Sequence, residues 1–280
     1  MGPERVSLLV FGALHYDVIV RAPRFPAPGE TLMGSAVDYA FGGKGGNQAL
    51  AAAASGGRVA MAGCVGNDAA GRVLLAGLDA GGIDRTRVRT VAGASGMSVA
   101  VVEETGENAA VVVSGVNRDL TGEDFDLPSD LTTALLQNEI PMSANLALAR
   151  RLPEGVRLIL NAAPAGPLPQ ELLDRTDVLI VNRIEAEMLA EAGCDPVEMA
   201  SRLRGTGPEV VVVTLGGEGV VAAGPDGLQK QPAEAVTVQS THGAGDAFCG
   251  AFAVALDAGA GLDAALNTGQ AAAARKVAQS

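Results

Sequence analysis

The chain has 280 residues, enough to bury a full hydrophobic core in one large α/β domain or two small ones. Hydrophobic residues make up 48% of the chain but aromatic residues only 3%, so we expect a core of Ala, Val and Leu. Such a core suits buried parallel strands covered by alanine-rich helices. The net charge of −12 argues against nucleic acid or an anionic membrane as a partner.

The N-terminal sequence lacks the long apolar segment and the cleavage site of a secretory signal. No apolar run approaches the roughly 20 residues that span a bilayer. The cysteines, Cys64, Cys194 and Cys249, have no CxxC spacing, which is typical of buried free thiols in a reducing compartment. We therefore expect a cytoplasmic protein without a membrane partner.

Short apolar strands alternate with helix-like segments along the chain. In order, the predicted elements are a strand at 6–12, a helix at 45–57, a strand at 58–66, a helix at 71–82, strands at 156–164 and 177–182, a helix at 183–193 and a strand at 209–217. This alternation predicts a mostly parallel sheet with helices on both faces, an α/β fold.

Two segments break the alternation. Residues 18–39 are strand-like but are interrupted by the sequence APRFPAPGE, and residues 97–113 form two β-runs around a turn at Thr105 and Gly106. We expect the segments at about 17–40 and 96–114 to pair into a small second sheet that acts as a lid. Because no linker, repeat or low-complexity tail divides the chain, residues 1–280 are predicted to form a single domain carrying this lid.

The sequence QSTHGAGDAFCGAF at 239–252 places a glycine-rich turn and a carboxylate before a helix predicted over 247–256. The N–H groups at a helix start are unpaired and, with the positive end of the helix dipole, favour a bound anion such as phosphate. Asp246 could simply cap this helix. Beside a phosphate, however, a carboxylate repels the anion, so its presence there would indicate a chemical role. We therefore hypothesise that Asp246 takes the proton of an attacking hydroxyl.

The sequence FGGKGGNQA at 41–49 is not a Walker A motif, because no Ser or Thr follows Lys44. It is not a Rossmann fingerprint either, since its glycine spacing differs. Its glycines would let a small ligand lie close to the backbone. Asn47 offers a donor and an acceptor that suit adjacent hydroxyls, or it caps the following helix; both interpretations stay open.

Two later motifs also lie at predicted strand ends. In VNRIEAE, Asn182 ends a strand, and Glu185 and Glu187 follow in the first helical turn. These acids either complement the helix dipole or hold a hydrated Mg²⁺ near nucleotide phosphates. The sequence VTLGGEGV at 213–220 is a strand that enters a glycine turn, where open α/β sheets bind ligands. The two histidines, His15 and His242, are too far apart in sequence to indicate a metal pair.

Taken together, these motifs resemble those of the ribokinase family, the PfkB-type carbohydrate kinases. GGKGGNQA is similar to the N-terminal signature of the family, and STHGAGDAFCGAF to its C-terminal signature. NRIE fits the family's Asn-x-x-Glu motif, and FPAPGET, GCVGNDAAG, LNAAPA and VTLGGEGV are also similar. The resemblance covers essentially the whole chain and implies a ribokinase-like three-layer α/β/α fold.

The resemblance also implies residue roles. Asp246 is implied as the general base, and the amides of Gly243, Ala244 and Gly245 as the groups that bind the transferred phosphoryl group. The implied sugar-site residues are Asp17, His15, Gly43, Lys44, Asn47 and Glu139. The implied nucleotide-site residues are Asn182, Thr214, Gly216, Gly219 and Gln270, with Gln270 beside the adenine. Glu185, together with Asn182, is implied to organise Mg²⁺ and the phosphates.

The chain departs from the family pattern at three places. His15 stands where ribokinases usually have Asn, so the sugar selectivity could differ. Ser240 replaces the usual aspartate that helps hold an activating potassium ion. The chain also ends at Ser280, near where the loop that closes the ion site and a terminal helix would follow. We therefore expect little activation by K⁺.

The first interpretation is an ATP-dependent kinase, with Mg²⁺ as cofactor, that phosphorylates a primary hydroxyl of a pentose-like sugar, preferably ribose. We also expect a homodimer formed through the lid. One alternative is a nucleoside or other furanose kinase, against which the shortage of aromatic residues argues. A second alternative is a sugar- or nucleotide-binding regulator that has lost catalysis, but such a protein would not need Asp246. A third, an NAD-linked oxidoreductase, is disfavoured by the glycine spacing.

Overall fold

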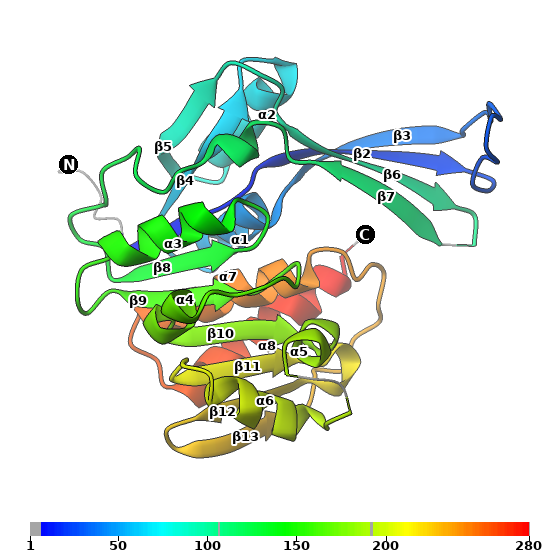
Figure 1. Cartoon of the computed structure of the whole chain (residues 1–280). Coiled ribbons are helices and arrows are strands. Elements are labelled where there is room, and N and C mark those ends of the chain that lie inside the picture. Colours follow the sequence, from blue (N-terminus) through cyan, green and yellow to red (C-terminus); the bar gives the residue numbers. More distant parts are fainter. Residues whose placement is uncertain (1–6, 106, 191–192, 280) are drawn as a thin grey trace.

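The computed structural model of the chain describes residues 7–105, 107–190 and 193–279. Its main sheet has nine strands in the order β13-β12-β11-β10-β9-β8-β1-β4-β5, with β12 and β13 antiparallel to their neighbours and the others parallel (Figure 1). The strands are β1 (Leu8–Phe11), β4 (Val59–Gly66), β5 (Asp84–Val91), β8 (Thr133–Gln137), β9 (Arg157–Asn161), β10 (Val178–Asn182), β11 (Val210–Thr214), β12 (Val220–Gly224) and β13 (Gly227–Gln231).

Helices cover both faces of this sheet. The helices are α1 (Lys44–Ala54), α2 (Ala69–Ala80), α3 (Met142–Arg151), α4 (Gln170–Arg175), α5 (Arg183–Leu189), α6 (Pro196–Arg204), α7 (Ala244–Asp257) and α8 (Leu262–Val277), with 3₁₀ turns η1 (Gly115–Asp119) and η2 (Gly216–Glu218). Along β1, Leu8 and Val10 belong to the apolar core that includes residues of α1, α2, α7 and α8, whereas Leu9 and Phe11 belong to the core that includes residues of α3 to α6. Because successive residues of a strand point to opposite faces, an all-apolar strand is buried between two layers of helices. The predicted three-layer α/β/α fold is confirmed.

The second sheet has the strand order β3-β2-β6-β7 and extends away from the body (Figure 1). Its strands are β2 (His15–Ala22), β3 (Ala36–Gly42), β6 (Gly96–Glu103) and β7 (Asn108–Val113), which overlap the segments predicted at 17–40 and 96–114. Of the turn predicted at Thr105 and Gly106, Gly106 lies outside the described residues. The sheet joins the body at its root, since β2 follows β1 after three residues and β3 ends just before α1.

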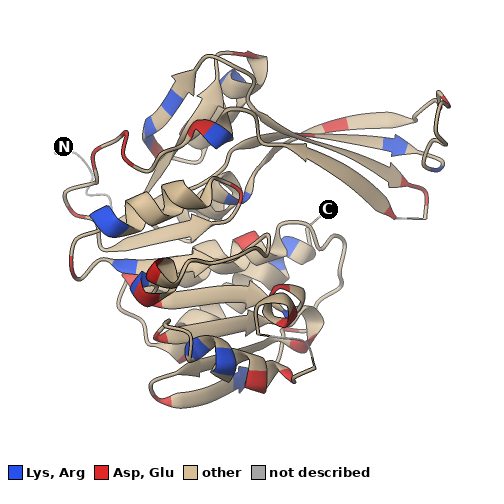
Figure 2. Ribbon diagram, in the orientation of Figure 1, with Lys and Arg blue, Asp and Glu red and all other residues tan. Residues whose placement is uncertain are grey.

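One face of the second sheet is apolar and exposed. Tyr39, Val18, Val99 and Val111 form a row across its four strands, and Tyr39 and Val111 are 62% and 68% exposed. Charged residues along this sheet lie mainly towards its outer end (Figure 2). The opposite face carries His15 and Asp17 at its root, both buried.

Among the described residues, no helix has the length and apolarity to cross a membrane. Cys64 and Cys249 are buried thiols, as predicted, but Cys194 is only half-buried. Helix α5 ends at Leu189, before the predicted limit, and the predicted helical residues 191–192 lie outside the described ranges.

Candidate active site

The N-terminus of α7 lies beside the carboxyl ends of β10 and β11, since Ala244 and Gly245 line the same cavity as Asn182 and Thr214. This is the edge at which open α/β sheets bind ligands. The helix begins at Ala244, three residues before the predicted start. It begins there because Gly243 adopts a left-handed φ of 73°, which glycine tolerates and other residues rarely adopt. No side chain caps this terminus; Ala244 N–H donates to Thr241 O at 3.3 Å. The turn is thus open to an anion.

Asp246 lies in the first turn of α7 and is 8% exposed. Burial raises the pKa of this carboxyl above its usual range, although Lys44, Gln48, Asn47 and His242 each act to lower it. The burial effect prevails, so the carboxylate is more basic than one in water. A buried carboxylate with a raised pKa is suited to accept a proton.

A chain of buried amides stands behind Asp246, and the sequence motifs gave no indication of it. Gln48 on α1 donates from Nε2 to Asp246 Oδ1 at 2.9 Å and to Asn161 Oδ1 at 3.0 Å. Gln137 Nε2 donates to Gln48 Oε1 at 2.8 Å. Asn47, the neighbour of Gln48, donates to the other oxygen of Asp246 at 3.4 Å, a long hydrogen bond. Asn47 is inside α1, whose N-cap is Gly43, so its interpretation as a helix cap is wrong.

Polar groups from several elements surround the N-terminus of α1. Glu139 Oε2 accepts from the backbone N–H of Lys44 at 2.7 Å and lies 3.9 Å from His15 Nδ1. His15 is 3% exposed, and its Nε2 is buried without a hydrogen-bond partner in the structure. Asp17 Oδ1 accepts from the Ser98 hydroxyl at 2.6 Å. An unpaired buried nitrogen is costly, so His15 Nε2 has an unused capacity to bind a polar ligand group.

Lys44 is half-buried, within electrostatic reach of three carboxylates. Burial lowers the pKa of its ammonium, but the charges of Asp246, Glu139 and Glu185 outweigh that effect and raise the pKa overall. The ammonium is therefore held in its charged form. A positive charge here can stabilise negative charge that moves through the site.

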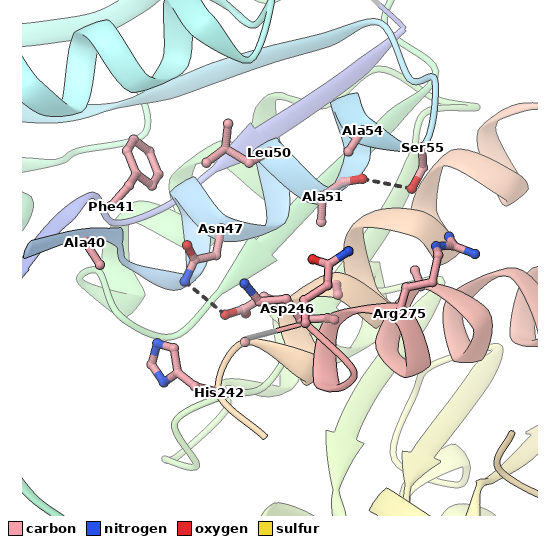
Figure 3. Close-up of a pocket in the computed structure, with 15 residues that line it drawn as sticks. Ala40, Phe41, Asn47, Leu50, Ala51, Ala54, Ser55, His242, Asp246 and Arg275 are labelled. Carbon is pink, nitrogen blue, oxygen red and sulfur yellow. Dashed lines mark hydrogen bonds between the residues drawn. The ribbon is translucent and has the colours of Figure 1, made fainter. Parts of the chain in front are cut away.

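A cavity of about 430 Å³ lies beside Asp246, between α1, α7 and α8 (Figure 3). Its lining includes Asn47, Ala51, Gly243, Asp246, Ala272 and Arg275. We call it the α1 cavity. The side chains of Asn47 and Asp246 point toward each other, with His242 on one side of them and Arg275 on the other. Of the predicted sugar-site residues, only Asn47 lines this cavity.

A second cavity, of about 490 Å³, lies on the other side of the same turn, and we call it the β11 cavity. The predicted nucleotide-site residues all line it: Asn182, Thr214, Gly216, Gly219 and Gln270. Ala244 and Gly245 of the α7 turn line it as well, together with apolar side chains such as Val236 and Phe248. The two cavities therefore adjoin the same helix N-terminus.

Asn182 and Glu185 form a capping box at the start of α5. The Asn182 side chain accepts from Glu185 N–H at 2.8 Å, and Glu185 Oε2 accepts from Asn182 N–H at 2.8 Å. Burial raises the pKa of Glu185, and the Asn182 hydrogen bond and Lys44 only partly oppose this effect. Nowhere in the described part of the chain do three or more His, Cys, Asp or Glu side chains gather as metal ligands. One buried carboxylate fits Mg²⁺ only as an ion shared with substrate phosphates and water.

The comparisons with known proteins agree with this geometry. Residues 6–280 match the pfkB family carbohydrate kinase. The chain belongs to this family. It is 37% identical to the ribokinase of Haemophilus influenzae over 284 residues, covering 98% of this chain and 92% of the relative.

Solved structures in the same family are also similar. The ribokinase from Thermotoga maritima superposes with a TM-score of 0.92 at 32% identity, covering 98% of this chain and 93% of that one. The Arabidopsis thaliana ribokinase in complex with ribose and ATP has a TM-score of 0.88 at 30% identity, with coverages of 98% and 93%. The sequence resemblance to the family is thus confirmed.

Proposed function

We propose that this protein is an ATP-dependent carbohydrate kinase that phosphorylates a primary hydroxyl of ribose or a similar pentose. One observation carries the proposal: the α1 and β11 cavities lie on the two sides of the α7 N-terminus, and Asp246 faces the α1 cavity. A phosphoryl donor in the β11 cavity and an alcohol beside Asp246 would then be separated only by the anion-binding turn. The names of the ribokinase relatives support ATP and ribose as the two substrates.

In the proposed reaction, the sugar hydroxyl oxygen attacks the γ-phosphorus of ATP. A new bond forms between that oxygen and phosphorus, while the bond from phosphorus to the oxygen bridging the β-phosphate breaks. Asp246 accepts the hydroxyl proton, and the products are the sugar phosphate and ADP. The amides of the Gly243–Gly245 turn and the Lys44 ammonium stabilise the charge on the transferred group.

The acceptor is proposed to extend from Asp246 toward the root of the second sheet, where Asp17, His15 and Glu139, which do not line the α1 cavity, offer hydrogen bonds to its hydroxyls. His15 Nε2, buried and unpaired, gains a partner when a hydroxyl reaches it. The second sheet then acts as a lid that excludes water, which would otherwise accept the phosphoryl group. Mg²⁺, when bound with the nucleotide near Glu185, would neutralise phosphate charge.

The exposed apolar face of the second sheet is proposed to pair with the same face of a second copy, giving a homodimer. The row of Tyr39, Val18, Val99 and Val111 supports this, since large exposed apolar patches mark interaction sites. The matched test compares Val111→Lys with Leu228→Lys, which changes a similarly exposed residue on β13. In light scattering, only Val111→Lys should give monomers. A monomeric wild-type protein would contradict the dimer.

The function is tested by incubating the protein with ATP, Mg²⁺ and a panel of sugars and nucleosides, and by measuring ADP release. We expect the highest kcat/KM with ribose or another pentose. Preference for a nucleoside would favour the alternative acceptor class. No ADP release above the ATP-only control with any acceptor would contradict kinase activity.

A further inference from the structure

The amide of Gln48 makes the shorter of the two side-chain hydrogen bonds that Asn47 and Gln48 donate to the proposed base. Gln48 is 0% exposed, and its Nε2 hydrogen bond to Asp246 Oδ1 at 2.9 Å is shorter than the 3.4 Å contact from Asn47. Gln48 and Asp246 are 198 positions apart in the chain. Gln48 is not among the residues that line either cavity, so its effect on the reaction is expected to pass through the groups that it contacts, of which Asp246 is the proposed base.

The orientation of the Gln48 amide is fixed by two neighbouring amides. Asn161 Nδ2 donates to the backbone carbonyl of Ile180 at 3.2 Å, so its Oδ1 faces Gln48 and must receive a hydrogen. On the other side, Gln137 Nε2 donates to the Gln48 Oε1 at 2.8 Å and to Leu135 O at 3.3 Å. Because backbone carbonyls only accept hydrogen bonds, they determine which end of each amide donates. The Gln48 Nε2 group is thereby aimed at Asp246.

We infer that Gln48 is a positioning residue for phosphoryl transfer, which holds Asp246 Oδ1 so that Oδ2 receives the proton of the acceptor hydroxyl. The inference rests on the proposed function, in which Asp246 is the base. A carboxylate that could rotate would present either oxygen at varying distances, and small misplacements of catalytic groups lower rates strongly. The bond to Gln48 removes that freedom and leaves a single oxygen toward the α1 cavity, where the long contact from Asn47 is easily replaced.

The test compares two substitutions of fully buried polar side chains. Gln48→Met keeps a similar volume but loses the donor to Asp246. The control, Thr133→Val, loses a buried hydroxyl that donates to Asp257 Oδ1 at 2.8 Å, outside the amide chain. Both should lower the melting temperature. Only Gln48→Met should lower kcat, by about 10- to 100-fold, with KM for ATP and sugar within about twofold of wild type.

A kcat for Gln48→Met within about threefold of wild type, with a melting temperature lowered as in the control, would overturn this inference and leave the kinase function intact. Absence of kinase activity in the wild-type protein would instead overturn the proposed function and this inference with it. If Gln48→Met does not fold, a crystal structure of the wild-type protein with bound sugar decides. The primary hydroxyl on Asp246 Oδ2, with Gln48 on Oδ1, supports the inference; the hydroxyl on Oδ1 overturns it.

Discussion

On the α1 side of the α7 N-terminus, charged and amide side chains are buried and joined by hydrogen bonds, whereas the β11 cavity is lined largely by glycine, alanine and valine. The first side is arranged around one carboxylate whose pKa is raised by burial. The second offers backbone and apolar surface, which suits a flat base and a phosphate chain held by main-chain groups. Substitutions on the two sides should therefore separate the rate of the chemical step from nucleotide binding.

The largest effect is expected from Asp246→Asn. The substitution keeps the shape of the side chain but removes the proton acceptor, so kcat should fall by at least about a hundredfold. The fold and ATP binding should persist, because the β11 cavity is unchanged. Steady-state kinetics and calorimetric titration with ATP measure the two quantities. Turnover near that of wild type would show that another group is the base.

The second effect is the pH dependence of kcat/KM. Because burial raises the pKa of Asp246 against the lowering effects of Lys44, Gln48 and His242, the base becomes protonated at a pH above the ordinary aspartate value of about 3.9. Below the raised pKa, kcat/KM should fall about tenfold per pH unit. A rate profile measured with the fold monitored in parallel tests this. An acidic limb at or below the ordinary aspartate pKa would contradict it.

His15→Asn tests the acceptor half of the site. The imidazole is rigid and larger than the Asn side chain usual in ribokinases, and its buried Nε2 has no partner in the structure. The substitution should change the ranking of sugars by kcat/KM, with a gain for ribose of several-fold, about 1 kcal/mol of binding. KM for ATP should stay nearly constant. An unchanged ranking would mean that His15 does not contact the sugar.

Gln270→Ala tests the nucleotide half. Gln270 lines the β11 cavity and donates to Gln231 Oε1 at 3.0 Å. Its loss should raise KM for ATP by about three- to tenfold, the effect of one hydrogen bond, with KM for sugar unchanged. Thr268→Ala, an exposed position on the same helix, is the control. Equal effects of the two substitutions would argue against an adenine near Gln270.

The smallest effect is expected from potassium. Ser240 cannot supply the carboxylate that helps bind the ion in the family, so K⁺ should increase the rate little over a bulky organic cation at equal ionic strength. Its hydroxyl accepts from His242 N–H at 3.2 Å, close to the α7 turn. The measurement is kcat against K⁺ concentration. A saturable, several-fold response would show that other groups form an ion site.

The parts of this molecule that local sequence patterns describe were predicted well. The alternating strands and helices, the glycine turn before Asp246 and the helix after Asn182 all depend on neighbouring residues. The start of α7 was placed three residues late, because the left-handed Gly243 acts as the N-cap. Helix α1 likewise begins after a glycine N-cap, Gly43, and its first residue, Lys44, lies three residues before Asn47. Asn47 could therefore be mistaken for the cap.

The amide chain behind Asp246 could not be predicted in this way. Gln48 bonds to residues 113 and 198 positions away, and Gln137 to one 89 positions away, so only the folded chain brings them together. One signal existed: Gln48 has the i, i+4 spacing with Ala52 that places it on the buried face of a helix of alanines. A buried polar side chain on such a face requires partners. The functional assignments of the site residues themselves stay predictions.

Gly250 of α7 sets the distance between α7, which carries Asp246, and α1, which carries Gln48. A Cβ atom there would lie 2.6 Å from the backbone oxygen of Gln48 and 2.7 Å from the amide nitrogen of Ala52. The two helices thus meet closely at this point, and Ala51 Cβ, 2.8 Å from the same position, leaves no room for a side chain. Even a methyl group at this position, about one helical turn from Asp246, would push α1 and α7 apart. The Gln48 amide would then move away from Asp246. The absence of a Cβ atom at residue 250 therefore fixes how closely α1 and α7 approach each other, and with it the position of Gln48 relative to Asp246.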